Sequence, residues 1–139
     1  MEYDFDIYID GACRGNPGEA AIGVVIKKNG KLVKEISRAI GQATNNIAEY
    51  TALISSLQQA LILKADKIRI FTDSELVYHQ IKGTYKVRNE NIKRLHEQAQ
   101  DLWQGFSFID ILNIPREQNQ EADRLASDAV ERRCQEICR

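Results

Sequence analysis

The sequence has little of what marks secreted, membrane-spanning or disulfide-rich proteins. It holds three cysteines, two histidines, two prolines and one tryptophan in 139 residues. Three cysteines are too few for a disulfide scaffold, so we expect Cys134 and Cys138 to be free thiols; the alternative is a bridge between the two. The longest apolar runs fall short of the roughly 20 residues that span a bilayer, and the acidic start has no signal-peptide core. We therefore expect a cytoplasmic protein without membrane contact.

The chain also lacks an excess of charge of either sign. It has 19 lysines and arginines against 20 aspartates and glutamates, a net charge of −1. Any surface that binds nucleic acid must therefore be a local basic patch. The only histidines, His79 and His96, fall on predicted helices and have no obvious catalytic partner. The sequence thus argues against a Ser-His-Asp or Cys-His enzyme.

What is present is the pattern of one α/β domain, in which residues 1–139 share a single hydrophobic core. We expect this domain to be a monomer. Hydrophobic periodicity predicts a first strand that ends at Asp10 and four further strands at 21–28, 31–40, 67–72 and 106–114. It predicts helices at 44–63, 74–82, 89–104 and from about 118 into the 130s. Short turns, Asn29-Gly30 among them, join the first three strands as an antiparallel meander. The two later strands follow helices, so we expect them to lie parallel to the first in a five-stranded mixed sheet flanked by helices.

Two aspartates follow predicted strands. Asp10 ends the first strand, before a glycine-rich stretch, and Asp73 ends the fourth. Each has an ordinary alternative explanation, since Asp10 could close a hairpin and Asp73 could cap the next helix. If the two strands are parallel neighbours, both carboxylates emerge at the carboxyl edge of the sheet, where α/β proteins place their ligands.

Two further acids fall on predicted helices. Glu49 lies one turn beyond Asn45 and beside the buried stripe, although an exposed helical glutamate would look the same. Asp123 lies in the first turns of the last helix, where the helix dipole alone favours an acid. Four carboxylates gathered at one edge would repel one another, and divalent cations would relieve that repulsion. Oxygen-rich sites suit Mg²⁺ or Mn²⁺, and two such ions about 4 Å apart can clamp an in-line displacement at a phosphate.

Four segments carry a family resemblance. They are Asp-Gly-Ala-Cys-Arg-Gly-Asn-Pro-Gly at 10–18, Thr-Asn-Asn-Ile-Ala-Glu at 44–49, Thr-Asp-Ser at 72–74 and Asn-Gln-Glu-Ala-Asp-Arg-Leu-Ala at 119–126. In this order and spacing they resemble ribonuclease H type 1, and the order of predicted elements matches along nearly the whole chain. The resemblance implies a ribonuclease H-like fold and an endonuclease that hydrolyses the RNA strand of RNA–DNA hybrids, leaving 5′-phosphate and 3′-hydroxyl ends. It also implies two bound Mg²⁺ ions, with Mn²⁺ as a substitute, held by Asp10, Glu49, Asp73 and Asp123.

The resemblance assigns substrate contacts as well. It implies that Glu49 touches a 2′-hydroxyl, the group that distinguishes RNA from DNA. Thr44 would help to hold a phosphate of the DNA strand. The remaining contacts would face the minor groove of the hybrid, and they are Asn16, Asn45, Asn46 and the backbone from Gly11 to Cys13.

Two departures from many relatives mark the chain as similar to a compact branch of the family. A loop with a catalytic histidine is replaced by the short segment 114–119, which has Arg116 and no histidine. We predict that Arg116 approaches the scissile phosphate; the alternative is a surface arginine. An extra basic helix is replaced by residues 83–89. We predict that Lys86 and Arg88 there meet the backbone of the hybrid; the alternative is a solvated connector.

The sequence leaves two other functions of this domain open. A nuclease of the same fold could also act on double-stranded RNA, and a catalytically silent module could bind nucleic acid without cutting it. Loss of a carboxylate would favour the silent module, but all four acids are present. Trp103, Phe106 and Phe108 could stack on bases, but their helix-end and strand positions predict core residues.

Overall fold

The computed structural model describes residues 2–138, and its elements follow the predicted order. They are β1 (Phe5–Arg14), β2 (Gly18–Lys28), β3 (Lys31–Ala43), α1 (Asn45–Ile62), β4 (Lys67–Thr72), α2 (Glu75–Lys82), α3 (Glu90–Trp103), β5 (Phe108–Asn113), a short 3-10 turn (Arg116–Gln118) and α4 (Gln120–Ile137). Within residues 2–138, none of the helices combines the length and the apolarity that a membrane span requires.

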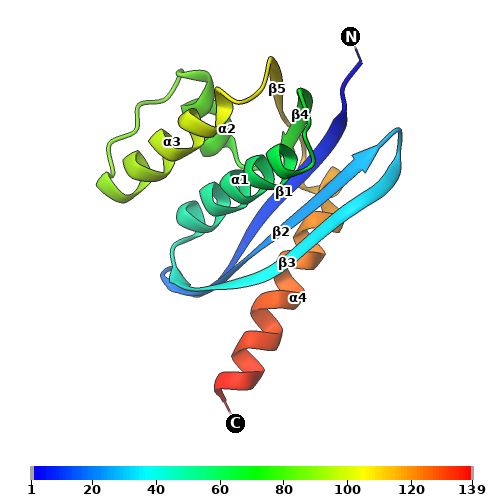
Figure 1. Cartoon of the computed structure of the whole chain (residues 1–139). Helices are drawn as coiled ribbons and strands as arrows, with labels where there is room; N and C mark the ends of the chain where they lie inside the picture. The colour runs from blue at the N-terminus through cyan, green and yellow to red at the C-terminus, as the bar shows by residue number, and fades with distance from the viewer. Residues whose placement is uncertain (1, 139) are drawn as a thin grey trace.

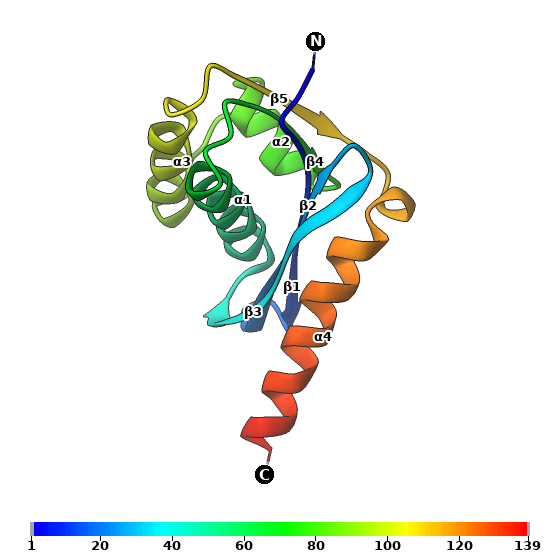
Figure 2. The same cartoon turned by 45° about the vertical axis from the view of Figure 1, so that its right-hand side comes forward.

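The five strands form one mixed sheet in the order β3-β2-β1-β4-β5 (Figure 1). β1, β2 and β3 pair antiparallel, whereas β4 pairs parallel with β1 and β5 pairs parallel with β4. α1 and α3 lie on one side of the sheet and α4 lies alone on the other (Figure 2). The predicted α/β fold, with three antiparallel strands and two parallel ones, is confirmed.

The predicted turn after β2 is confirmed, whereas the predicted end of β1 is not. Asn29 and Gly30 have φ angles of 51° and 79°, the positive values that the predicted tight hairpin needs. The prediction that the first strand ends at Asp10 is wrong. β1 continues to Arg14 because residues 11–14 keep their antiparallel pairing with β2. The parallel ladder between β1 and β4 does end with the pair Ile9 and Thr72, so Asp10 and Asp73 are the first residues beyond it.

The main core lies between the sheet and α1. Tyr50, Leu53 and Leu57 of α1 are fully buried against strand residues such as Ile7 and Ile9. Burial of each large apolar side chain contributes about 1.5–3 kcal/mol to folding. The one polar group of this stripe is also satisfied, because the hydroxyl of Tyr50 donates to Oε1 of the buried Gln80 at 2.6 Å.

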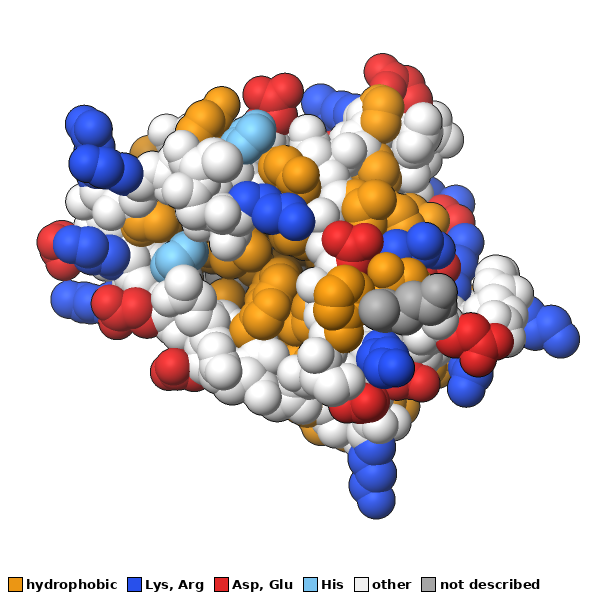
Figure 3. Space-filling model, turned by 90° about the horizontal axis from the view of Figure 1, so that it is seen from above, with side chains coloured by type: hydrophobic (Ala, Val, Ile, Leu, Met, Phe, Trp, Pro, Cys, Tyr) orange, Lys and Arg blue, Asp and Glu red, His pale blue; other side chains and the backbone are white. Residues whose placement is uncertain are grey.

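The three aromatic residues near β5 divide between core and surface. Phe106 is buried and Trp103 packs against the core, as predicted. Phe108 is 39% exposed, so its assignment to the core is wrong. The reason is that α4 packs on β1, β2 and β3 and leaves the same face of β4 and β5 uncovered. Seen from above, hydrophobic side chains are visible on the surface between charged ones (Figure 3).

The position of α4 is set by a glycine on β2. A Cβ atom at Gly23 would lie 2.1 Å from the carbonyl oxygen of Ala122 and 2.8 Å from the amide nitrogen of Ala126. Only glycine therefore lets the backbone of α4 rest directly on the sheet. Gly23 is also the register partner of Asp10 on the neighbouring strand. This contact consequently places the first turn of α4, which carries Asp123, beside the strand that carries Asp10.

Candidate active site

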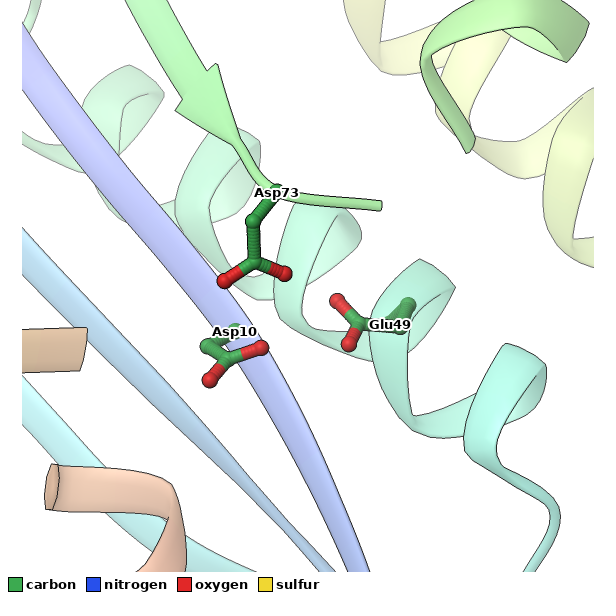
Figure 4. Close-up of side chains that lie close together, drawn as sticks. All are labelled: Asp10, Glu49 and Asp73. Atoms are coloured by element: carbon green, nitrogen blue, oxygen red, sulfur yellow. The ribbon is translucent and has the colours of Figure 1, made fainter. Parts of the chain in front are cut away.

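Three carboxylates meet where the β1–β4 ladder ends. Asp10 from β1, Asp73 after β4 and Glu49 from α1 point toward one another (Figure 4). Each offers a carboxylate oxygen, and these oxygens lie within 4.8 Å of one another. Asp10 is 4% exposed. Two strands and one helix thus bring three of the four predicted acids together.

A second close approach, at Gly11, brings α1 to this point. A Cβ atom there would lie 2.7 Å from both the carbonyl carbon of Ala48 and the amide nitrogen of Glu49. The start of α1 is fixed as well, because the Thr44 hydroxyl accepts from the amide of Ile47 at 3.2 Å. The Asn16 side-chain oxygen accepts from the amide of Asn45 at 3.0 Å and so joins the helix to the β1–β2 turn. Glu49 is thereby held beside Asp10.

The ordinary explanations for these three acids are excluded. Ser74, and not Asp73, caps α2, because its hydroxyl accepts from the amide of Val77 at 3.2 Å. Asp10 lies within β1, and the turn to β2 comes after Arg14. Glu49 points toward the other two carboxylates and is only partly exposed, unlike an ordinary surface glutamate of a helix.

The fourth acid, Asp123, lies in the first turn of α4 and lines the same pocket of about 660 Å³. It falls outside the tight cluster of three, and its side chain is 34% exposed. Arg116 also lines this pocket, and its Nη2 lies 3.9 Å from Oδ1 of Asp123. The Arg116 side chain is 80% exposed, so it is free to reorient toward an anion.

Burial and mutual repulsion make this cluster costly to ionise. Burial, with the neighbouring Asp73 charge as the next cause, raises the pKa of Asp10 to about 8. Burial and the Asp10 charge likewise raise the pKa of Glu49 well above its usual range. Oε2 of Glu49 is buried and has no hydrogen-bond partner within residues 2–138. Buried carboxylate oxygens without a donor are the ligands that a hard divalent cation takes, so these residues fit such an ion.

Most of the residues predicted to touch substrate line one of two hollows. Gly11, Cys13, Asn45 and Asn46 line the carboxylate pocket. Asn16, Thr44 and again Asn46 line a smaller hollow that reaches the start of α3. Lys86 and Arg88 line neither; they are exposed on the connector before α3.

Several residues of these hollows were not predicted. Asn89 and Asn91 line the smaller hollow, and Arg14 and Ser127 line the carboxylate pocket. Asn119 is 1% exposed, and its side-chain amide contacts Asp73. Its place in the fourth motif was a signal, but an asparagine before a helix is ordinarily interpreted as an N-cap.

Carboxylates clustered at the carboxyl edge of an α/β sheet define a class of proteins built to bind hard divalent cations. Comparison with known proteins narrows this class. A family model described as "Reverse transcriptase-like" matches residues 8–129. Ribonuclease H of Clostridium botulinum is 32% identical over 142 residues, covering 90% of this chain and 94% of that protein. The chain belongs to the ribonuclease H family.

Solved structures agree with this assignment. RNase H1 of Halobacterium salinarum superposes with a TM-score of 0.89 at 41% identity and covers 91% of this chain and 97% of that one. LC11-RNase H1, solved in complex with an RNA/DNA hybrid, has a TM-score of 0.89 at 35% identity and covers 94% and 99%. Some curated relatives are longer. The chain spans 63% of Ribonuclease HI of H. salinarum, at 42% identity over 125 residues and 89% of this chain, and 35% of a bifunctional protein of Mycobacterium tuberculosis.

The raised pKa of Asp10 predicts how stability depends on pH when no metal is present. The folded protein binds this proton more tightly than the unfolded chain, whose pKa is near 3.8. The contribution of Asp10 to the free energy of unfolding is therefore full below about pH 4 and is lost as the pH rises to about 8. Asp10→Asn should be more stable than the wild type at pH 8, and this advantage should shrink toward pH 4 by at most about 1.4 kcal/mol per pH unit.

Urea unfolding in a chelator, repeated across this pH range, measures the difference. Asp128→Asn, on an exposed part of α4, is the matched control and should show no such trend. A constant difference between Asp10→Asn and the wild type would mean that the folded state does not hold this proton.

Proposed function

We propose that this domain is a divalent-cation-dependent endonuclease that hydrolyses the RNA strand of RNA–DNA hybrids and leaves 5′-phosphate and 3′-hydroxyl ends. The observation that carries the proposal is the cluster of Asp10, Glu49 and Asp73 in a pocket that Asp123 completes. Family membership supports it, as does the relative solved in complex with an RNA/DNA hybrid. We further propose that the domain acts as a monomer in the cytoplasm.

Asp10, Glu49, Asp73 and Asp123 would together hold two Mg²⁺ ions, or Mn²⁺ in their place. Bound there, the ions supply an activated water and charge stabilisation of the leaving 3′-oxygen. The chain's own contribution is to hold the carboxylates where they repel one another, so that cation binding relieves an existing cost. Asp123, the more exposed acid, adds a ligand from the α4 side of the pocket.

Selectivity for RNA would come from the start of α1. Glu49 lies at the pocket and can accept a hydrogen bond from a 2′-hydroxyl, which DNA lacks. Asn45 and Asn46 are exposed on the first turn of α1 and line the pocket with the backbone of Gly11 and Cys13. These groups would face the minor groove together with Asn16.

The smaller hollow would take a phosphate of the DNA strand. Thr44 caps α1 there, so the free amides of a helix N-terminus lie beside it and favour an anion. The side-chain amides of Asn89 and Asn91 add further polar groups. The hollow lies between the starts of α1 and α3 and therefore next to the connector that carries Lys86 and Arg88.

A cleavage assay with matched duplexes tests the proposed reaction. The RNA strand of a hybrid should be cut in Mg²⁺, and an all-DNA duplex of the same sequence should not. Asp10→Asn and Asp73→Asn keep the side-chain shape and remove the charge, so cleavage should fall by orders of magnitude while the fold survives. Asp128→Asn should cleave normally.

Near-normal cleavage by Asp10→Asn would refute the assignment of the metal centre. Efficient cutting of the all-DNA duplex would refute RNA recognition at the minor groove. A duplex of RNA alone, included in the same assay, measures whether the activity extends to double-stranded RNA.

Arg116 would stabilise charge that develops on the scissile phosphate. Its exposed guanidinium lines the pocket and is only loosely paired with Asp123. Arg116→Ala should therefore lower kcat more than it raises KM, because the contact strengthens in the transition state. Steady-state kinetics on the hybrid measures both, with Arg124→Ala, an exposed arginine of the same region, as the control. An unchanged kcat would make Arg116 an ordinary surface arginine.

Lys86 and Arg88 would hold the backbone of the hybrid without taking part in the chemistry. The connector is anchored because the side-chain amide of Gln80 donates to the carbonyl of Lys86 at 3.3 Å. If each residue neutralises one phosphate, replacing both with alanine should raise KM and flatten the log–log salt dependence by roughly 1.4–1.8, with kcat nearly intact.

KM measured against salt concentration decides this point. The matched control replaces Lys31 and Lys34, two exposed lysines beside the Asn29-Gly30 turn, and should keep the wild-type slope. A slope unchanged by the Lys86 and Arg88 substitutions would place the basic surface elsewhere.

A further inference from the structure

We propose that Asn119 is a positioning residue of the metal centre, whose side-chain amide holds the carboxylate of Asp73 against the strand that carries Asp10. The inference rests on the proposed function, because it takes the carboxylate cluster to be a cation site. It gives a role to a buried polar side chain that lies beside the cluster and carries no charge of its own.

One amide group reaches both strands. Nδ2 of Asn119 donates to the carbonyl oxygen of Ile9 at 2.8 Å and to Oδ2 of Asp73 at 3.2 Å. Ile9 is the last residue of β1 in the parallel ladder, and Asp73 directly follows the last residue of β4. Asn119 therefore joins the two strands just beyond the point where their own pairing stops. The link therefore contacts Asp73 directly and lies one residue from Asp10, the other aspartate that must converge.

The Asn119 side chain makes these two hydrogen bonds instead of capping its own helix. Asn119 stands at the N-cap position of α4, where asparagine usually accepts a hydrogen bond from a backbone amide of its own helix. Here it makes no side-chain cap hydrogen bond. The side chain turns to the sheet instead, and the helix begins without that stabilisation. The contact with Asp73 and Ile9 is what occupies the side chain in place of the cap.

The orientation of the amide is fixed by its donors. Asn119 is 1% exposed, and its Oδ1 is buried without a hydrogen-bond partner within residues 2–138. Turning the amide over would place that oxygen against the Ile9 carbonyl and the Asp73 carboxylate, both of which are acceptors. A buried acceptor without a partner costs stability. The two donated hydrogen bonds are therefore the interactions that this residue provides.

The backbone of Asn119 extends the link to the remaining pocket residues. Its carbonyl oxygen accepts from the amide of Asp123 at 3.1 Å, and its amide donates to the carbonyl of Arg116 at 3.0 Å. One buried residue thus connects Asp73, the strand of Asp10, the turn of Asp123 and the turn of Arg116. A carboxylate that accepts a hydrogen bond on one oxygen is restricted in rotation, so its other oxygen points in a defined direction. Removing a partner of this kind typically lowers metal affinity 10–100-fold.

Metal binding by the whole chain without substrate tests the role directly. Asn119→Leu keeps the branched shape at Cγ with a larger volume, removes both donated hydrogen bonds and leaves no room for a replacement water. Its dissociation constant for Mn²⁺, measured by titration calorimetry, should rise about 10–100-fold. The Mg²⁺ concentration that gives half-maximal hybrid cleavage should rise in step. Most of the rate should return at saturating Mg²⁺, which a merely misfolded site would not allow.

Asn113→Ala is the matched control for Asn119→Ala. Nδ2 of Asn113 donates to the carbonyl of Thr72 at 3.1 Å, at the same edge of the sheet but not to a carboxylate. Asn113→Ala should keep the wild-type Mn²⁺ affinity, whereas Asn119→Ala should lose affinity. Asn119→Ala also carries the test if Asn119→Leu does not fold, with circular dichroism as the check.

The outcomes separate this inference from the function on which it rests. Wild-type affinity in the folded Asn119 variants, or an equal loss in Asn113→Ala, would overturn the positioning role alone. Failure of the wild-type chain to bind Mn²⁺ would overturn the proposed function and this inference together.

Discussion

The structure depends on bringing like charges together at a partly buried edge of the sheet. Asp10, Glu49 and Asp73 each present an oxygen within 4.8 Å of the others, and burial already raises the pKa of Asp10 to about 8. Such a cluster opposes folding unless the surrounding framework holds it in place. Two glycines make this framework possible, since a Cβ atom at Gly11 or at Gly23 would collide with the backbone of the facing helix.

Stability for this arrangement comes from elsewhere in the chain. α1 carries Glu49 at the pocket and buries Tyr50, Leu53 and Leu57 on the sheet. The apolar contacts that hold the helix therefore also hold the acid against its neighbours. On the opposite face, Ala122 and Ala126 are small enough for α4 to lie directly on β2. Glu49 and Asp123 are thus carried by helices that are themselves packed against the sheet.

The sequence predicted the features that local pattern determines, and it missed those that depend on contact across the sheet. Strand β4 and the turn at Asn29-Gly30 came directly from periodicity and turn chemistry. β1 was ended too early because its polar residues beyond Asp10 are held by pairing with β2, which no local signal shows. Phe108 was assigned to the core because its sequence does not reveal that α4 stops short of β5. Asn119 was missed for the same reason, since a helix start predicts an N-cap and not a partner on another strand.

The same cluster bears on how a chain of net charge −1 could hold a polyanion. Four acids face the pocket, and the two cationic side chains that line it, Arg14 and Arg116, are each paired with an acid of α4. Without cations, those carboxylates that are ionised would repel a phosphate backbone, although Asp10 and Glu49 hold their protons more tightly than usual. Two divalent ions would cancel the charge of four carboxylates and leave the arginines free to exchange carboxylate for phosphate. Metal and nucleic acid would then bind cooperatively, because each relieves a repulsion that the other would meet alone.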